Sequence, residues 1–252
     1  MRAMLRVSPN LAQKLAEDGP ILALTGAGVS AASGLATFRG PGGIWEGRDP
    51  MELATPEAFL ADPETVWRFY AWRREQAANA RPNPAHEALA ALERKRAGFR
   101  LVTQNVDGLH ERCGNRRILR LHGTLWRSRC SADGAEFDDD RYTFTELPPR
   151  CECGAPLRPA VVWFGEALDR DVLHRAEAAA RQASLVLVAG TSSLVYPAAA
   201  LPEIARQNGA YVVEINPERT SLSERADEHL SGPADELLPL IAESVSTGPG
   251  AR

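Results

Sequence analysis

The chain has 252 residues, of which 44% are hydrophobic, and its 33 acidic and 29 basic side chains give a net charge of -4. This balance excludes an intrinsically disordered chain, and the length fits one globular domain with or without a small insert. The acidic excess argues against a general nucleic-acid partner, because neutralising phosphates requires surplus basic residues. The four cysteines are too few for a disulfide-rich secreted scaffold of this size.

The N-terminal sequence MRAMLRVSPN has no apolar segment typical of a secretory signal. The longest apolar stretches fall far below the roughly 18 to 20 residues that span a bilayer. We therefore expect a cytoplasmic protein with no membrane partner.

Short apolar runs in chain order predict five strands, at residues 21–24 (ILAL), 101–102, 161–164 (VVWF), 185–189 (LVLVA) and 211–215 (YVVEI). Several are apolar throughout, as expected of strands covered on both faces by helices. Helical patterns lie between them, at residues 84–97, 171–183 and 197–208. The first begins with Asn83 as N-cap and ends at Gly98. This alternation predicts an α/β fold with a parallel sheet.

Two segments interrupt the alternation. Residues 40–82 form a Gly/Pro-rich loop followed by aromatic-rich helices, and residues 123–157 hold three cysteines and an acidic run. We interpret both as insertions that build a smaller second lobe. The prediction is one discontinuous catalytic unit over residues 1–245. Its large lobe spans about 1–39, 83–122 and 158–245, its small lobe spans 40–82 and 123–157, and residues 246–252 form a flexible tail.

A glycine-rich loop follows the first predicted strand. Gly26, Gly28 and Ala31 form G-x-G-x-x-A, a variant of the dinucleotide fingerprint in which backbone N–H groups approach a pyrophosphate. A tight strand-to-helix turn without a ligand fits the same letters. A dehydrogenase would continue with a helix, a strand and an acidic residue about 20 residues later. Residues 33–43 (SGLATFRGPGG) cannot supply these, so we expect a dinucleotide bound under an unusual loop that carries Phe38 and Arg39.

Six motifs in order then identify a family. GAGVSAASGLATFRG, TQNVDGLH, LHGTLWRSRC, RPAVVWFGE, AGTSSLVYPAA and EINPE lie within residues 26–218. Together they resemble the sirtuins, which are NAD-dependent protein-lysine deacylases. The resemblance covers about residues 15 to 242. It implies a Rossmann-like large lobe and a small lobe made of a zinc module and a helical module.

The resemblance also implies a reaction that consumes NAD. The acyl-lysine carbonyl oxygen attacks C1′ of the nicotinamide ribose, nicotinamide leaves, and a histidine base helps the ribose 2′-OH attack the resulting imidate. The products are lysine, nicotinamide and O-acyl-ADP-ribose, and the partner is an acylated lysine in a protein or peptide. Alternatives are mono-ADP-ribosyl transfer or NAD hydrolysis, and a non-catalytic NAD-sensing module.

Catalytic and cofactor roles follow from the resemblance, residue by residue. His122 would be the base, with Asn105 and Asp107 as further catalytic residues at the nicotinamide pocket. From the residues alone, His122 reads as structural, and an Asx-turn that caps a helix is an alternative role for Asn105 or Asp107. The cofactor set is Gly26, Ala27, Gly28, Ser30, Ala31, Phe38, Arg39, Trp45, Gln104, Asn105, Asp107, Gly190, Thr191, Ser192, Asn216, Glu218 and Ala234.

Tyr70 and Arg73 are three residues apart in a helical pattern and share a face. They resemble the Tyr-x-x-Arg pair with which class III sirtuins bind succinyl- or malonyl-lysine, and Ala54 matches that branch as a pocket-widening residue. Without the resemblance, Arg73 would read as a solvated charge. The implied substrate set is Ala54, Tyr70, Arg73, Val162, Trp163, Phe164, Gly165 and Glu166. Removal of succinyl, malonyl and acetyl groups is expected.

Three clustered cysteines suggest a structural zinc site that departs from the usual pattern of two C-x₂₋₄-C pairs. Cys130 lacks a cysteine partner, since Asp133 stands where relatives often have one, and Cys151 and Cys153 form C-x-C. Zinc on Cys130, Cys151 and Cys153, with or without Asp133, and a metal-free module both stay open.

Overall fold

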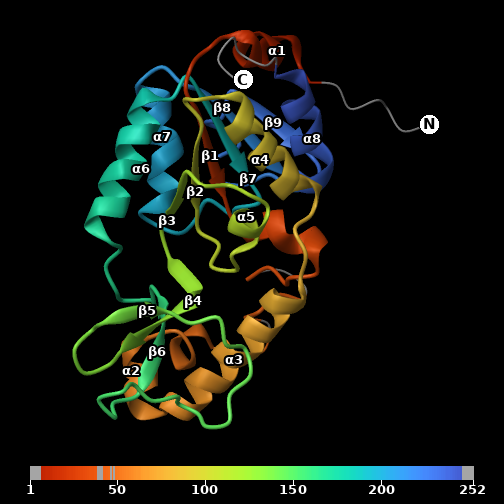
Figure 1. Ribbon diagram of the computed structural model, residues 1–252. Coiled ribbons are helices and arrows are strands. Elements are labelled where there is room, and N and C mark those ends of the chain that lie inside the picture. The colour runs from red at the N-terminus through yellow and green to blue at the C-terminus, as the bar shows by residue number, and fades with distance from the viewer. Residues whose placement is uncertain (1–6, 39–41, 46, 48, 246–252) are drawn as a thin grey trace.

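The computed structural model describes residues 7–38, 42–45, 47 and 49–245 (Figure 1). Arg39 and the predicted tail at 246–252 lie outside the described residues. The elements are α1 (Pro9–Ala16), β1 (Ile21–Thr25), η1 (Ala27–Ser33), η2 (Pro50–Glu52), α2 (Pro56–Ala61), α3 (Pro63–Asn79), α4 (Pro84–Lys95), β2 (Arg100–Thr103), α5 (Leu109–Arg112), β3 (Ile118–Arg120), β4 (Gly123–Cys130), β5 (Glu136–Asp138), β6 (Leu157–Val161), α6 (Arg170–Gln182), β7 (Leu185–Ala189), η3 (Ala198–Ala200), α7 (Leu201–Gln207), β8 (Tyr211–Asn216), β9 (Glu228–Ser231) and α8 (Ala234–Ser244).

The large lobe is built on a parallel sheet of six strands in the order β3-β2-β1-β7-β8-β9. This is the strand order of dinucleotide-binding folds, in which the chain direction across the sheet reverses beside the first strand. Thr25 at the end of β1 is in register with Thr103 of β2 and with Ala189 of β7. The carboxyl ends of these strands therefore meet at one edge of the sheet.

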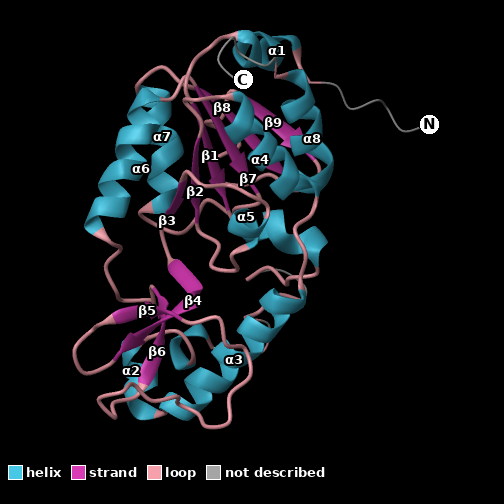
Figure 2. Cartoon of the chain, in the orientation of Figure 1, coloured by secondary structure: helices cyan, strands magenta, loops and turns pink. Residues whose placement is uncertain are grey.

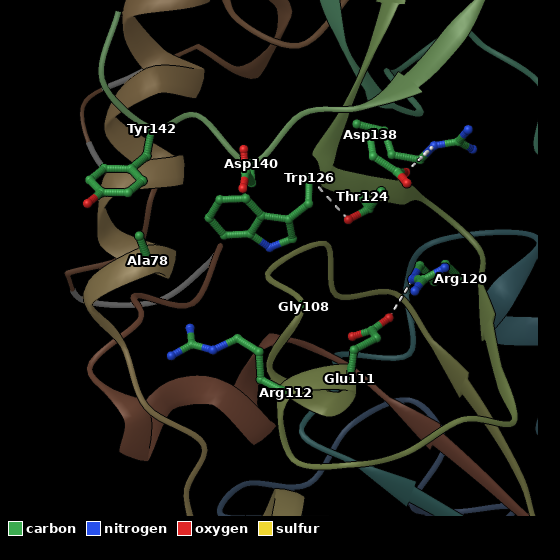
Figure 3. Close-up of a pocket in the computed structure, with 11 residues that line it drawn as sticks. Ala78, Gly108, Glu111, Arg112, Arg120, Thr124, Trp126, Asp138, Asp140 and Tyr142 are labelled. Atoms are coloured by element: carbon green, nitrogen blue, oxygen red, sulfur yellow. Dashed lines mark hydrogen bonds and ion pairs between the residues drawn. The ribbon is translucent and has the colours of Figure 1, made fainter.

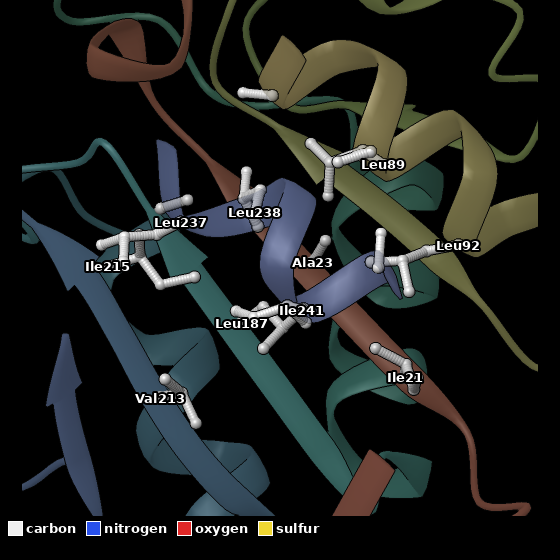
Figure 4. Close-up of a cluster of buried hydrophobic side chains, with 14 of the residues drawn as sticks. Ile21, Ala23, Leu89, Leu92, Leu187, Val213, Ile215, Leu237, Leu238 and Ile241 are labelled. Carbon is white, nitrogen blue, oxygen red and sulfur yellow. The ribbon is translucent and has the colours of Figure 1, made fainter. Parts of the chain in front are cut away.

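Helices cover both faces of this sheet, as Figure 1 shows. One core packs α1, α4 and α8 against side chains such as Ile21 and Ala23 of β1 (Figure 4). The other core packs α6 and α7 against the alternate side chains, Leu22 and Leu24. Every residue of β1 and of β7 is buried. The continuous apolar runs arise because both faces of these strands are covered.

The small lobe holds a three-stranded antiparallel sheet, β5-β4-β6, beside α2 and α3 (Figure 2). A third core joins these elements around Val66 and Trp67. The fully buried Arg74 of α3 forms an ion pair with Asp139 at 3.2 Å and donates to the backbone carbonyl of Arg127 at 3.1 Å. The helical segment and the cysteine-bearing segment are thus bound into one lobe. The lobe boundaries given from the sequence stay a prediction.

One predicted strand was wrong. The run at 161–164 contributes only Val161 to a strand, because β6 begins at Leu157 and ends there. β6 also belongs to the small antiparallel sheet instead of the parallel sheet. The chain leaves the strand at Trp163, whose backbone N–H donates to the Glu166 carboxylate at 2.8 Å, and Gly165 turns it with φ 85°.

The predicted helices are confirmed within a few residues. Asn83 caps α4 through the backbone N–H of Ala85, and His86 completes a capping box. The pattern at 197–208 divides into η3 and α7. β3 and β9 were not predicted, because both are short and lack a continuous apolar run. Within the described part of the chain, no helix combines the length and apolarity needed to cross a membrane.

Candidate functional site

A cavity of about 1020 Å³ lies at the carboxyl edge of the parallel sheet and extends to the small lobe. Loops after β1, β2, β7 and β8 line it, together with residues of α3 and the segment after β6. Ligands of α/β folds bind at this edge. The predicted residues that line it are Gly26, Ala27, Gly28, Ala31, Phe38, Trp45, Ala54, Tyr70, Arg73, Gln104, Asn105, His122, Val162, Trp163, Phe164, Gly165, Glu166, Gly190, Thr191, Ser192, Asn216, Glu218 and Ala234.

The two glycine loops after β1 and β7 touch through their backbones. The N–H of Gly28 donates to the carbonyl of Gly190 at 2.8 Å. A Cβ on Gly28 would lie 2.7 Å from the Cα of Gly190, and one on Gly190, whose φ is 61°, would lie 2.4 Å from the nitrogen of Val29. Only glycine fits at either position, and the backbone stays bare where a phosphate would approach.

Polar side chains of the strand ends are fixed across the sheet. Gln104 Nε2 donates to Thr191 Oγ1 at 3.0 Å, and Asn216 Nδ2 donates to the Thr191 carbonyl at 2.8 Å. Asn105 Nδ2 donates to the Gly26 carbonyl at 3.0 Å. With its amide N–H groups used this way, Asn105 keeps its Oδ1 to accept a hydrogen bond from a ligand.

Asp107 and Ser30 lie beneath the cavity lining. The Ser30 hydroxyl donates to Asp107 Oδ2 at 2.8 Å, and the backbone N–H of Leu109 donates to Oδ1 at 2.9 Å. Both residues are almost fully buried, with 2% of Ser30 and 8% of Asp107 exposed. Ser30 thus contacts Asp107, and neither of these predicted residues is among those that line the cavity.

A second cavity, of about 450 Å³, lies behind this loop at the junction of the lobes (Figure 3). Trp126 of β4 lines it and donates from Nε1 to the backbone carbonyl of Asp107 at 2.7 Å. Gly108, with φ 79°, packs on the same indole. Among the ionic groups that line it, Glu111 pairs with Arg120 and Arg127 pairs with Asp138. Trp126 therefore supports Asp107 from the side away from the main cavity.

His122 follows β3 and lines the main cavity. Burial lowers the pKa of its imidazole below the ordinary 6.5, and the hydrogen bond between Nδ1 and the Gln104 carbonyl, at 3.2 Å, opposes that shift in part. The ring is therefore neutral at pH 7. With the proton on Nδ1 for that bond, Nε2 carries the free lone pair and can accept a proton.

Tyr70 and Arg73 line the other end of the cavity, and both belong to α3. The Arg73 guanidinium carbon lies 5.1 Å from the Phe38 ring centroid and 5.6 Å from that of Tyr70. Burial lowers the pKa of Arg73 from its usual value, and the nearby Tyr70 and Asp107 oppose this. Among the described residues, no carboxylate lies within ion-pair distance of Arg73.

Aromatic rings cover this end of the cavity. Trp45 packs against Phe38, Phe69 and Phe164, with centroids 5.6, 5.7 and 6.4 Å apart. The segment after β6 is fixed opposite them, since the N–H of Val162 donates to the His122 carbonyl and that of Phe164 to the Ala54 carbonyl. These two bonds hold the segment after β6 between His122 and Ala54.

The three cysteines converge outside this cavity. The sulfurs of Cys130, Cys151 and Cys153 lie within 4.8 Å of one another, and those of Cys130 and Cys153 are 3.5 Å apart. Zinc–thiolate bonds of about 2.3 Å in a tetrahedron place the sulfurs about 3.8 Å apart. The thiols therefore fit three positions of a structural zinc site. Asp133 Oδ1 accepts the Ala135 N–H at 2.9 Å, and Asp133 is not part of this group.

Several lining residues were not predicted. The segment Leu194, Val195 and Tyr196 follows the predicted residues after β7, and residues 219–221 follow Glu218. Leu194 and Tyr196 are 57% and 70% exposed, which is unusual for large apolar side chains. The motif AGTSSLVYPAA continues past the predicted Ser192 through Leu194, Val195 and Tyr196. The extent of that motif was the sequence signal that could have identified the first of these segments.

The comparisons with known proteins agree with this geometry. The model of the Sir2 family matches residues 26–197. The chain belongs to the Sir2 family. It is 49% identical to NAD-dependent protein deacylase 2 of Pyrobaculum aerophilum, over 94% of this chain and 95% of the relative. It is also 49% identical to the NAD-dependent protein deacylase of Aquifex aeolicus, over 94% and 99%.

Solved Sir2 structures superpose on nearly the whole chain. A Sir2 homologue mutant in complex with ADP-ribose gives a TM-score of 0.91 at 47% identity and covers 95% of this chain and 96% of its own. A Sir2 homologue–NAD complex gives 0.89 at 47% identity, with 95% and 94% covered. The predicted fold class, a Rossmann-like large lobe with a smaller lobe, is confirmed.

Proposed function

We propose that this Sir2-family NAD-dependent protein deacylase prefers lysine acyl groups that end in a carboxylate, such as succinyl and malonyl, and retains activity on acetyl-lysine. The observation that carries the proposal is Arg73. Its cationic side chain lines the cavity and has no carboxylate partner among the described residues. Asp107 and Tyr70 offset the cost of burying this charge only in part, since the pKa of Arg73 stays lowered, so a ligand carboxylate would relieve more of that cost.

Tyr70 and Ala54 support the same end of the cavity. Burial raises the pKa of the Tyr70 phenol, which keeps its proton and can donate it. A guanidinium and a phenol together offer a carboxylate charge-assisted hydrogen bonds. Ala54 is a small, 5% exposed residue whose side chain leaves room beside them.

The remaining roles are proposed for the chain's own side chains. Gly26, Gly28, Gly190 and Asn216 would hold the adenosine and phosphate half of NAD, and Asn105 and Asp107 the nicotinamide end. NAD, when bound, supplies the ADP-ribosyl group that accepts the acyl group. Ser30 would keep the Asp107 carboxylate oriented through its 2.8 Å hydrogen bond.

His122 is proposed as the general base. Its Nδ1–H···O bond to Gln104 fixes the tautomer, and the Nε2 lone pair would take a proton from a ribose hydroxyl in the cavity. The backbone of residues 162–166 would hold the acyl-lysine strand alongside. The lysine leaves as the free amine, and one water molecule is consumed in the overall reaction.

The test compares succinyl-lysine and acetyl-lysine versions of one peptide. Arg73→Met keeps an unbranched, flexible side chain and removes the guanidinium and its charge. We expect kcat/KM for the succinyl peptide to fall by at least ~10-fold, because a charged hydrogen-bonded contact contributes about 1.5–3 kcal/mol, with a smaller change for the acetyl peptide. Unchanged kcat/KM for the succinyl peptide in Arg73→Met would refute the proposed binding of the acyl carboxylate by Arg73.

Release of nicotinamide separates this proposal from the alternatives. Release that requires an acyl-lysine peptide supports deacylation. Release without a peptide indicates NAD hydrolysis, and no release indicates a binding module.

A further inference from the structure

Trp163 lies between the acyl end of the cavity and a buried arginine. Its indole Nε1–H donates to the Tyr70 hydroxyl at 2.9 Å, and its ring centroid is 3.5 Å from the guanidinium carbon of Arg158. Phe59 packs against the same ring at 5.4 Å. The side chain is only 3% exposed although it lines the cavity. The indole is therefore in contact with Arg158 and Phe59 and is hydrogen-bonded at its one polar atom.

An ion pair fixes the backbone of the same residue. Arg158 donates to the two carboxylate oxygens of Glu166 at 2.6 and 2.8 Å and to the Val161 carbonyl at 3.1 Å. Glu166 Oε2 also accepts the backbone N–H of Trp163 at 2.8 Å. This bidentate pair is largely removed from solvent, so its geometry is well defined. Neither Arg158 nor its stacking on Trp163 was expected from the sequence.

The hydrogen bond between Trp163 and Tyr70 has only one possible direction. An indole N–H donates and cannot accept, so the Tyr70 oxygen is the acceptor. The phenol's own proton must then point away from the indole. Because Tyr70 lines the cavity, that proton is available to a ligand in it. A ligand atom placed there must be an acceptor, as a carboxylate oxygen is.

We propose that Trp163 is a positioning residue for acyl selection: its indole N–H fixes Tyr70 as a donor, and the Arg158–Glu166 pair holds the indole in place. This inference rests on the proposed preference for carboxylate-bearing acyl groups. It gives Trp163 a role beyond filling the lobe core with Phe59 and Tyr70. Its action is on the acyl terminus and passes through the Tyr70 hydroxyl.

A double-mutant cycle tests this route. Trp163→Phe keeps an aromatic ring and removes the N–H, and Tyr70→Phe removes the hydroxyl. The readout is the ratio of kcat/KM for succinyl and acetyl peptides. We expect each single variant to lower the ratio by about two- to ten-fold, mainly through KM for the succinyl peptide. In the double variant, Trp163→Phe adds no further loss, because the group through which it acts is gone.

Trp67→Phe is the matched control. Trp67 is also buried in this lobe and donates from Nε1, but to the Leu157 carbonyl. It should leave the ratio within about two-fold of wild type. Trp163→Phe could instead lower the succinyl-to-acetyl ratio of kcat/KM as much in the Tyr70→Phe background as in wild type. That result would overturn the inference and leave the proposed function standing. A wild-type ratio with no succinyl preference, unaltered by Arg73→Met, would overturn both.

The indole N–H gives a readout that does not depend on turnover. In an amide-proton NMR spectrum, Trp163→Phe removes one indole resonance and so assigns it. Tyr70→Phe should shift that resonance upfield, and Trp67→Phe should not. An assigned Trp163 resonance that stays in place in Tyr70→Phe would refute the hydrogen bond and with it the positioning role.

Discussion

Replacing Gly108 by alanine tests how the small lobe supports Asp107. Gly108 has φ 79° and ψ 9°, and its added Cβ would lie 2.6 Å from Nε1 of Trp126 (Figure 3). The indole would have to move, and its 2.7 Å hydrogen bond to the Asp107 carbonyl would be lost. Gly34 provides the control, since its φ of 85° and ψ of 7° are nearly the same and no atom lies within 4 Å of its Cβ position.

Both variants carry the free-energy cost of an alanine at positive φ, and they differ only in the contact of the added Cβ with Trp126. An alanine in the left-handed region costs about 1–2 kcal/mol. Losing the Trp126 hydrogen bond and leaving a buried carbonyl unpaired adds about 1–3 kcal/mol. We expect Gly34→Ala to lower the free energy of unfolding by about 1–2 kcal/mol and Gly108→Ala by about 2–5 kcal/mol.

Urea unfolding measures these free energies, and steady-state kinetics measures the second effect. Because Asp107 is proposed to contact the nicotinamide end of NAD, Gly108→Ala should also raise KM for NAD, whereas Trp126→Phe should reproduce part of that rise without the backbone cost. Equal destabilisation by the two alanines, within about 0.5 kcal/mol of experimental error, would show that the Trp126 contact does not hold this loop.

Three further results are expected. The acidic limb of kcat/KM should have its inflection below pH 6.5, because burial lowers the pKa of His122 and the base must be neutral; an inflection above pH 6.5 would contradict this assignment. Burial also lowers the pKa of His86 to about 4 in the folded chain. As the pH drops from 6.5 to 4, the imidazole is protonated in the unfolded chain before it is in the folded one, so the free energy of unfolding falls. His86→Gln keeps a capping residue and should reduce that slope by up to ~1.4 kcal/mol per pH unit, measured by urea unfolding at several pH values; an unchanged slope would exclude His86 as the titrating group. Metal analysis of protein purified without added zinc should find about one zinc per chain. Cys130→Ser should lose this zinc. Wild-type protein that contains no zinc would show that the cysteine module does not bind the metal.

Several parts of the structure follow from local sequence. The apolar runs of β1 and β7 and the capped helix α4 are confirmed, because burial on both faces and capping act over a few residues. The sequence also drew attention to the glycines after β1. Their reason, the 2.8 Å contact between Gly28 and Gly190, joins segments that are 162 residues apart and needed the fold.

Other features depend on which side chains meet. The run at 161–164 is as apolar as a strand, yet it leaves the sheet because Glu166 accepts the N–H of Trp163 and Arg158 holds Glu166. Ser30 reads as a loop residue and in the fold contacts Asp107. Neither partner is visible in the local pattern.

The α/β class, the Sir2 motifs and the residue types available for each role can be read from the chain without the fold. Those properties depend on periodicity and on residue identity, which the chain carries directly. The tertiary structure alone decided that Arg73 has no carboxylate partner among the described residues, that Trp163 donates to Tyr70, and that the three thiols converge. These are distances between distant segments, and only packing of the two lobes sets them.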